Sequence, residues 1–220
     1  MSLTDLLAIA GQAIAAPLDR SFGPEDHLRS LSHLAEELAA LLHQRNGFFA
    51  YQSALLVRPL SHERPPLGVI QWNEAGLWKE EYHADLGEVI FFAEDVFGNQ
   101  FAIRSGGVWF FDAETGDLEF IAESLDEWAR LVVGNPEYWT GYPLLQQWQA
   151  KHGTLPAGER LAPKLPFVLG GGYEVENLYS VNDVEGMRFR GSLARQIRDV
   201  PDGAQIRIKL IHRPPQNDAT

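Results

Sequence analysis

Cysteine is absent from this chain of 220 residues. Its absence excludes disulfides, thiol catalysis, and zinc or iron–sulfur sites held by cysteine. Long apolar runs are also absent, since none approaches the ~18 residues that span a bilayer. The apolar start of the chain lacks lysine and arginine and contains Asp5 and Gln12, so it does not fit a signal peptide. We therefore expect an amphipathic N-terminal helix in a cytoplasmic protein without membrane contacts.

Basic residues are scarce in the middle of the sequence. Residues 74–127 hold 14 acidic residues against only Lys79 and Arg104, a local net charge of −12 that equals the net charge of the whole chain. Residues 187–213 hold seven basic residues against two acidic ones, a local net charge of +5. Because phosphates need a basic surface, the middle region is not expected to bind nucleic acid directly. The pattern favours a basic protein partner, with a merely solubilising acidic surface as the plain alternative.

Apolar residues are numerous enough for a packed core. The hydrophobic fraction is 45% and includes six tryptophans and 12 phenylalanines. Leucines that recur at three- and four-residue steps predict an amphipathic helix over residues 28–42. The pair Asn46-Gly47 ends this helix, and the run that follows, residues 48–60, is strand-like.

Four short apolar runs come next, with turn residues between them. These runs are residues 89–93, 100–104, 107–112 and 118–122. Gly98, Gly106 and Gly116 supply the positive-φ positions that tight turns need. The runs are too close together for crossover helices, so they predict an antiparallel meander.

Helix signals return after the meander. Ser124 and Glu127 form a capping box, which predicts the start of a helix that contains Trp128. A second helix, broken at Pro143, is expected to run to Gly153. The remaining elements are expected in the order of a Pro-rich connector over residues 154–166, a strand over 174–179, a helix over 187–198 and a strand over 205–211.

Motifs for metals and nucleotides fail at specific positions. No two of the seven histidines have the three- or four-residue spacing of a helical ligand pair, and Pro66 stands where a second histidine would follow His62. The stretch from Asp112 to Glu123 has Asp117 where a calcium loop needs glycine. The glycines at 170–172 lack the rest of a dinucleotide fingerprint. We therefore expect no metal and no cofactor.

The adjacent acids Glu94 and Asp95 raise the question of a catalytic pair. Adjacent residues of a strand point to opposite faces, so their carboxylates converge only if a bulge redirects one of them. Asp95 is well placed to accept backbone amides of the turn that follows. A structural turn residue is the preferred interpretation, and no catalytic residue is predicted. An enzyme that uses both acids stays an alternative.

Two stretches together resemble the core of a known family. They are VIFFAEDVFGNQFAI, residues 89–103, and GGVWFFDAETGDLEFIAESLDEWARLV, residues 106–132. The family pattern is an apolar strand ending in an acid pair, a Phe-Gly-Asn turn, an aromatic strand, an Asp-x-Glu-Thr-Gly hairpin and a helix entered through serine. On this pattern the chain is similar to the SUKH superfamily, which unites Syd-type proteins with the yeast Smi/Knr cell-wall regulators. The positions that carry the family's structural motif are Asp95, Phe97, Gly98, Asn99, Gly116, Ser124 and Trp128.

The resemblance implies a fold and a division of the chain. The implied fold is α+β, a twisted and mostly antiparallel sheet with helices packed on one side. Residues 1–22 are expected as an N-terminal helix, 23–135 as the SUKH-like core domain, and 136–220 as a C-terminal helical and strand extension packed on the core.

The resemblance also implies a function. Bacterial members are understood as immunity proteins, which bind and neutralise a polymorphic toxin domain, often a nuclease or nucleic-acid deaminase, without being enzymes themselves. Such a toxin has a basic substrate face, which an acidic partner reaches quickly at low salt. The predicted acidic face comprises Glu80, Glu81, Asp85, Glu88, Glu94, Asp112, Glu114, Asp117 and Glu119. Trp72 and Trp78 are candidate exposed anchors, with core packing as the alternative for each.

A regulatory scaffold of the yeast type is the alternative function. Immunity predicts one tight partner, with a dissociation constant of about a nanomolar or below, whereas a scaffold predicts several weaker partners.

Overall fold

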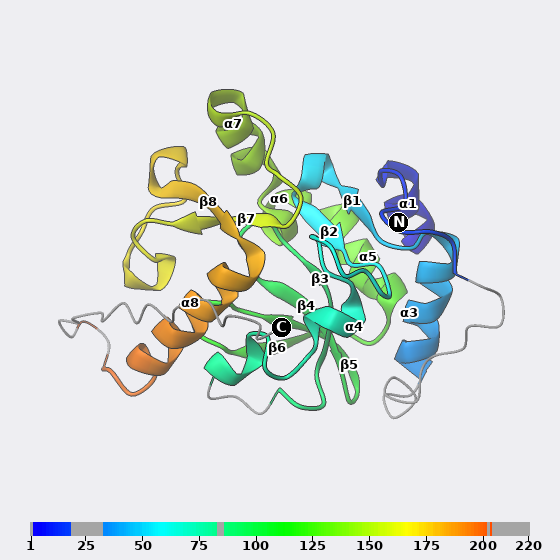
Figure 1. Cartoon of the computed structure of the whole chain (residues 1–220), viewed down its shortest axis with the longest axis horizontal. Helices are drawn as coiled ribbons and strands as arrows, with labels where there is room; N and C mark the ends of the chain where they lie inside the picture. The colour runs from blue at the N-terminus through cyan, green and yellow to red at the C-terminus, as the bar shows by residue number, and fades with distance from the viewer. Residues whose placement is uncertain (1, 19–32, 83–85, 202, 204–220) are drawn as a thin grey trace, which may run out of the picture.

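The computed structural model describes residues 2–18, 33–82, 86–201 and 203. It confirms the expected α+β fold, because a six-stranded antiparallel sheet has its strands hydrogen-bonded in chain order (Figure 1). The strands are β1 (Phe48–Ala50), β2 (Leu55–Val57), β3 (Ile90–Glu94), β4 (Gln100–Arg104), β5 (Gly107–Phe111) and β6 (Leu118–Ala122).

The four apolar runs of the meander are β3 to β6. β4 and β5 pair without a shift, from Gln100 opposite Phe111 to Arg104 opposite Gly107. The run expected as one strand over residues 48–60 is instead the hairpin of β1 and β2. A 3-10 turn, η1 (Tyr51–Ser53), reverses the chain there, and all three of its residues have positive φ. The turn was missed because Tyr51, Gln52 and Ser53 include no glycine, which is the usual sequence signal for positive φ.

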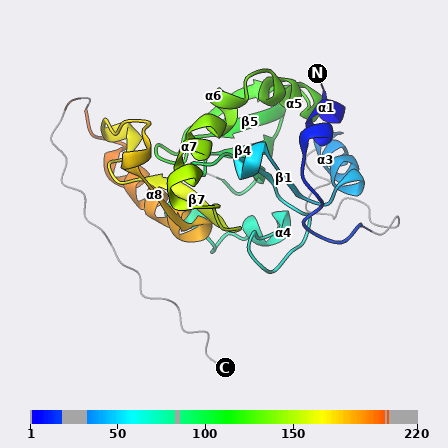
Figure 2. The ribbon, with the colours of Figure 1, turned by 90° about the horizontal axis from the view of Figure 1, so that it is seen from above.

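Three helices cover one face of the sheet: α1 (Leu3–Ile9), α3 (His33–Gln44) and α5 (Leu125–Gly134). Figure 2 shows α5 on one side of the sheet and α4 on the other. On the α5 side, Leu38, Phe92 and Trp128 belong to one buried apolar cluster. The expected start of α5 is observed, because the Ser124 hydroxyl accepts the backbone amide of Glu127 at 3.2 Å.

The N-terminal segment contains a shorter helix than expected. The prediction of a helix over residues 1–22 is wrong in its extent, since α1 ends at Ile9 and Ala10 is extended. Residues 11–15 instead run along the edge of β1, where the amide of Gly11 donates to the Phe49 carbonyl at 2.7 Å. This backbone pairing covers one of the two edges of the sheet.

The other face of the sheet is also covered. The covering elements are α4 (Val69–Trp72), the 3-10 turn η2 (Lys79–Glu81) and α8 (Asp183–Ile197). A second buried cluster on this face contains Trp72, Trp78, Phe91, Phe111 and Met187. The strands between the two clusters are therefore buried on both faces.

The C-terminal extension forms a small unit of its own. Its elements are α6 (Pro136–Thr140), α7 (Tyr142–His152), β7 (Glu159–Pro163), η3 (Phe167–Leu169), η4 (Val175–Asn177) and β8 (Leu178–Asn182). β7 pairs antiparallel with β8, so the prediction of only a Pro-rich connector over residues 154–166 missed a strand. Trp148 and Leu161 pack with Val96 and Phe97 of the β3–β4 turn, which joins the extension to the core. The strand expected over residues 205–211 lies outside the described residues.

The cap of α5 gives a test of this packing. Replacing Ser124 by alanine removes the acceptor for an amide at the helix start, so we expect the free energy of unfolding to fall by about 1 kcal/mol. Ser124→Asp keeps an oxygen at the same place and should restore most of the loss. Urea unfolding of the three proteins checks this. Equal midpoints for wild type and Ser124→Ala would contradict the role of the cap.

Candidate functional site: an acidic surface around a buried charge cluster

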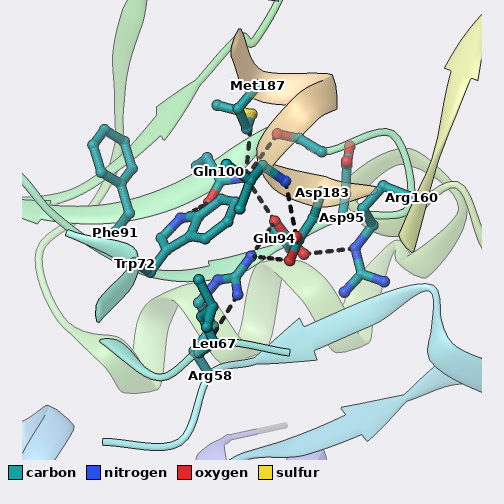
Figure 3. Close-up of polar contacts among 12 residues, drawn as sticks. Arg58, Leu67, Trp72, Phe91, Glu94, Asp95, Gln100, Arg160, Asp183 and Met187 are labelled. Carbon is teal, nitrogen blue, oxygen red and sulfur yellow. Dashed lines mark hydrogen bonds and ion pairs between the residues drawn. The ribbon is translucent and has the colours of Figure 1, made fainter. Parts of the chain in front are cut away.

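Glu94 lies at the centre of a buried cluster of charges (Figure 3). It is the last residue of β3, and its carboxylate contacts two arginines. Arg58, which directly follows β2, donates from Nη2 to Glu94 Oε2 at 2.8 Å. Arg160 of β7 lies on the other side, with Nε 2.7 Å from Oε1, as an ion pair that is not aligned as a hydrogen bond. Both arginines are buried, so Glu94 compensates only one of the two positive charges and a second acid is needed.

Asp183 and Gln100 complete this cluster. Asp183, the first residue of α8, lies 3.3 Å from Arg58 Nη2, so the cluster holds two positive and two negative groups. Gln100 donates to Glu94 Oε2 at 2.8 Å and accepts from the indole of Trp72 at 2.9 Å. The Trp72 ring lies against the guanidinium of Arg58, 3.4 Å from ring centroid to Cζ. The sequence analysis did not identify Arg58, Arg160 or Asp183 as members of a site.

The pKa values of the two carboxyls shift in opposite directions. Burial alone would raise the pKa of Glu94, but the charges of Arg160 and Arg58 and the Gln100 hydrogen bond hold it below its usual range. Burial raises the pKa of Asp183, and the negative charge of Glu94 adds to this, against the lowering effect of Arg58. Of the two carboxyls, Glu94 is therefore the one whose ionised form the cluster favours more.

Asp95 has a different surrounding from Glu94. Its Oδ1 accepts the backbone amides of Phe97 at 2.8 Å and Asn99 at 2.9 Å, and its Oδ2 accepts the Asn99 side chain at 2.8 Å. Burial raises the pKa of Asp95 to about 7, although these hydrogen bonds and the charge of Arg190 lower it. The Asn99 side chain also accepts the amide of Ala113 at 3.1 Å, which ties the β3–β4 turn to the β5–β6 turn.

The two adjacent acids thus have separate partners and do not share a proton. Glu94 faces Arg58, which follows β2, and Arg160 of β7, whereas Asp95 closes its own turn. Both are buried, so neither presents a carboxylate to solvent. In the part of the chain that the structure describes, no three histidine, aspartate or glutamate residues are arranged to hold a metal ion. None of the described helices is both long and apolar enough to cross a bilayer.

The predicted acidic face is only partly at the surface. Glu80, Glu88, Asp117 and Glu119 are exposed, and Glu81 and Asp112 are half-buried. The assignments of Glu94 and Glu114 to this face are wrong, because both are buried. Asp85 lies outside the described residues. We call the remaining six acids the acidic surface: Glu80, Glu81, Glu88, Asp112, Asp117 and Glu119. Its members do not share one face of the sheet, because Glu119 lies opposite Phe110 on the α5 side and η2 lies on the other side.

The prediction of exposed tryptophan anchors is wrong as well. Trp72 and Trp78 are both fully buried in the cluster between the sheet and α8. Trp78 Nε1 donates to the Trp72 carbonyl at 3.0 Å, and its ring lies 4.9 Å from that of Phe91. The alternative of core packing therefore holds for each tryptophan.

Two contacts position parts of the acidic surface. The Tyr82 hydroxyl donates to the Ala113 carbonyl at 2.8 Å, which holds η2 beside the β5–β6 turn. Gly116 has a φ of +79°, and a Cβ there would lie 3.1 Å from the Tyr82 ring, so glycine permits both the turn and the approach. Lys79 is buried beneath Glu80 and donates to the Leu86 and Val89 carbonyls at 3.3 and 2.8 Å.

Removing the charge of Glu94 should destabilise the fold strongly. Glu94→Gln leaves two buried arginines with one carboxylate, and we expect the free energy of unfolding to fall by about 3–5 kcal/mol. Glu88→Gln makes the same chemical change at an exposed position and should stay within about 0.5 kcal/mol of wild type. Urea unfolding measures both variants. Equal stability of the two would show that the cluster does not hold the fold together.

The buried amine of Lys79 should appear in the pH dependence of stability. Burial lowers its pKa from the usual 10.5 to about 8. Between these values the unfolded chain keeps a proton that the folded chain has released, so the contribution of Lys79 to the free energy of unfolding rises as pH increases from about 8 to 10. Lys79→Met lacks this contribution. The free energy of unfolding of wild type, minus that of Lys79→Met, should therefore increase over that pH range. A difference that is constant with pH would contradict the assignment.

Comparison with known proteins gives a fold and no family. No family model matches the sequence, and no curated protein matches it. The crystal structure of Atu4351 from Agrobacterium tumefaciens is similar to this chain, with a TM-score of 0.54 over 86% of this chain and 87% of that one. The sequence identity is 15%, so the similarity concerns the fold alone. This chain thus shares a common α+β arrangement with Atu4351 over most of both lengths.

Proposed function

We propose that this chain is a non-enzymatic immunity protein of the cytoplasm, which binds and neutralises a basic toxin domain that acts on nucleic acid. The observation that carries the proposal is the acidic surface. Glu80, Glu88 and Glu119 are exposed in a stretch where Lys79 is buried, which leaves Arg104 as its one exposed base among the described residues. Two arginines of α8 approach this stretch from outside, since Arg195 pairs with Glu81 at 2.5 Å and Arg188 donates to the Leu77 carbonyl at 2.7 Å, but the exposed acids still outnumber the bases there.

The arrangement of the interior supports recognition over chemistry. Glu94 and Asp95, the strongest candidates for a catalytic pair, are occupied by arginines and by backbone amides. The residues that carry the resemblance to the SUKH superfamily are likewise turn and core residues. The surface is then where function is expected to lie, and its charge points to a basic partner.

Electrostatic complementarity would let such a protein bind the toxin before the toxin reaches nucleic acid. A toxin that cleaves or modifies nucleic acid must present positive charge to phosphates. An acidic surface is steered to that same face and blocks access to it. Steering of this kind raises association rates by ~10–1,000-fold at low ionic strength, which suits the capture of a harmful enzyme before it finds its substrate.

The direct test is capture of the partner from a lysate of the source cell with the full chain as bait. Binding is done at low salt and is followed by a wash at about 0.5 M salt, where surface charges are strongly screened. A single basic protein that elutes in a fixed ratio and loses nuclease or deaminase activity when bound would support the proposal. Several weakly held proteins would instead indicate the regulatory scaffold.

Neutralising the acidic surface should slow association with the captured partner. We expect the triple variant Glu80→Gln, Glu88→Gln and Glu119→Gln to reduce the association rate about tenfold or more at low salt. The rate should approach that of wild type at high salt, because screening removes the same attraction. Stopped-flow or surface-based kinetics over a salt series measures both effects.

A matched control separates local charge from net charge. Glu36, Glu63 and Glu185 are exposed acids outside the stretch 74–127, and replacing all three by glutamine changes the net charge by the same amount. This control should leave the association rate close to that of wild type. Equal slowing by both triple variants would mean that only the total charge matters, and the acidic surface would then not be the binding site.

A further inference from the structure

Most of the exposed large hydrophobic side chains lie in one part of the molecule. Of the seven among the described residues, five follow residue 135: Tyr138, Leu165, Val168, Tyr173 and Tyr179. Three of these five belong to residues 165–173, which we call the aromatic loop. The aromatic loop connects β7 to η4 and lies at the end of the molecule opposite α1 and α3 (yellow in Figure 1). Exposed apolar side chains that gather in this way mark interaction sites.

Hydrogen bonds to the Asn177 side chain hold the aromatic loop in one conformation. Asn177 accepts the amide of Leu165 at 2.9 Å and donates to the carbonyls of Leu165 and Gly172, each at 3.0 Å. Gly171 lies so close to the Leu165 carbonyl that a Cβ would come within 1.9 Å of its oxygen. The backbone is therefore fixed while apolar side chains point outward, which is the arrangement of a preformed binding surface.

Rings are stacked within this loop. Phe167 and Tyr173 lie parallel, with an interplanar angle of 5° and a centroid distance of 3.9 Å. Phe97, from the β3–β4 turn, packs against both rings in a T-shaped arrangement, with centroid distances of 5.4 Å to Phe167 and 5.7 Å to Tyr173. Tyr173 remains 67% exposed in spite of these contacts. Its aromatic ring is thus rigidly held and open to a partner.

Three acids and two basic residues lie around this exposed ring. Glu114 accepts the amide of Val168 at 2.8 Å, which joins the aromatic loop to the β5–β6 turn of the acidic surface. Partial burial raises the pKa of Tyr173, and the charges of Asp95, Glu114 and Asp112 raise it further. The bases are Lys164, which donates to the Glu176 carbonyl at 2.7 Å, and the buried Arg190, whose charge acts on Asp95 and Glu114. An aromatic ring near several carboxylates is a favourable place for a cation, above all for a planar one.

We propose that the aromatic loop is a docking site for an arginine of the basic partner, whose guanidinium stacks on the exposed ring of Tyr173. Leu165 and Val168 then contact the apolar part of the arginine side chain and its neighbours. The inference rests on the proposed function for the basic character of the partner. It adds a specific contact to the non-specific attraction of the acidic surface.

The test uses the full chain and two synthetic probes. One is a short labelled peptide of alternating arginine and leucine, and the other has lysine in place of arginine. We expect wild type to bind the arginine peptide about fivefold more tightly than the lysine peptide, because both cations are attracted to the ring but the planar, weakly hydrated guanidinium also stacks on it. Tyr173→Ser should remove this preference. Tyr179→Ser, the same change at an exposed tyrosine of β8, should keep it.

The outcomes separate this inference from the proposed function. Absence of arginine preference in wild type, absence of binding to either peptide, or equal behaviour of Tyr173→Ser and Tyr179→Ser would each overturn the docking site. Urea midpoints equal to wild type would show that both variants are folded. The proposed function is judged independently by capture of a toxin, and an arginine preference that depends on Tyr173 upholds the docking site whichever protein is captured.

Discussion

A carboxylate held between two arginines is the interaction on which the rest of the structure depends. Glu94 lies in β3 and Arg160 in β7, Arg58 directly follows β2, and α8 adds Asp183. Taking such charges out of water is costly, and their mutual attraction compensates only when the geometry is complete. The C-terminal extension therefore has one acceptable position on the sheet, the one that brings Arg160 and Asp183 to Glu94 and Arg58. Apolar packing of Leu161 and Trp148 alone would tolerate small shifts, which the ion pairs do not.

Under the proposed function, this use of the interior leaves recognition to the surface. The acids that look most like a reaction centre in the sequence are those with the most internal partners, and the acids with few partners lie outside. Glu114 connects the two, since it is buried among the turn residues of the acidic surface and at the same time holds the backbone of the aromatic loop. A charged surface that attracts the partner would then lie next to a fixed aromatic ring that binds it specifically. In many tight interfaces the charges set the association rate and a few aromatic residues supply most of the binding energy.

Much of the fold could be predicted because its signals are local. β4 and β6 follow from apolar runs between glycine turns, and α5 follows from Ser124 and Glu127. β7 was missed because a strand in a Pro-rich stretch exists only through pairing with β8, which is remote in sequence. The burial of Arg58 and Arg160 was missed for the same reason, since no local pattern says that a basic residue will meet a carboxylate inside. Glu94 and Glu88 are the same residue type with opposite environments, and only the covering of both faces of β3 distinguishes them.

The pairing of the strands in chain order has a consequence for how the chain assembles. Each strand of the six-stranded sheet finds its partner next to it in the sequence, so the sheet needs few long loop closures. Arg58 and Glu94 both belong to this early part, and Arg160 and Asp183 both belong to the part that follows. Each part thus brings one positive and one negative group to the junction and is neutral there by itself. The sheet can form as the chain leaves the ribosome without burying an uncompensated charge. The extension can join it later, when Arg160 and Asp183 add a second pair of opposite charges to Arg58 and Glu94.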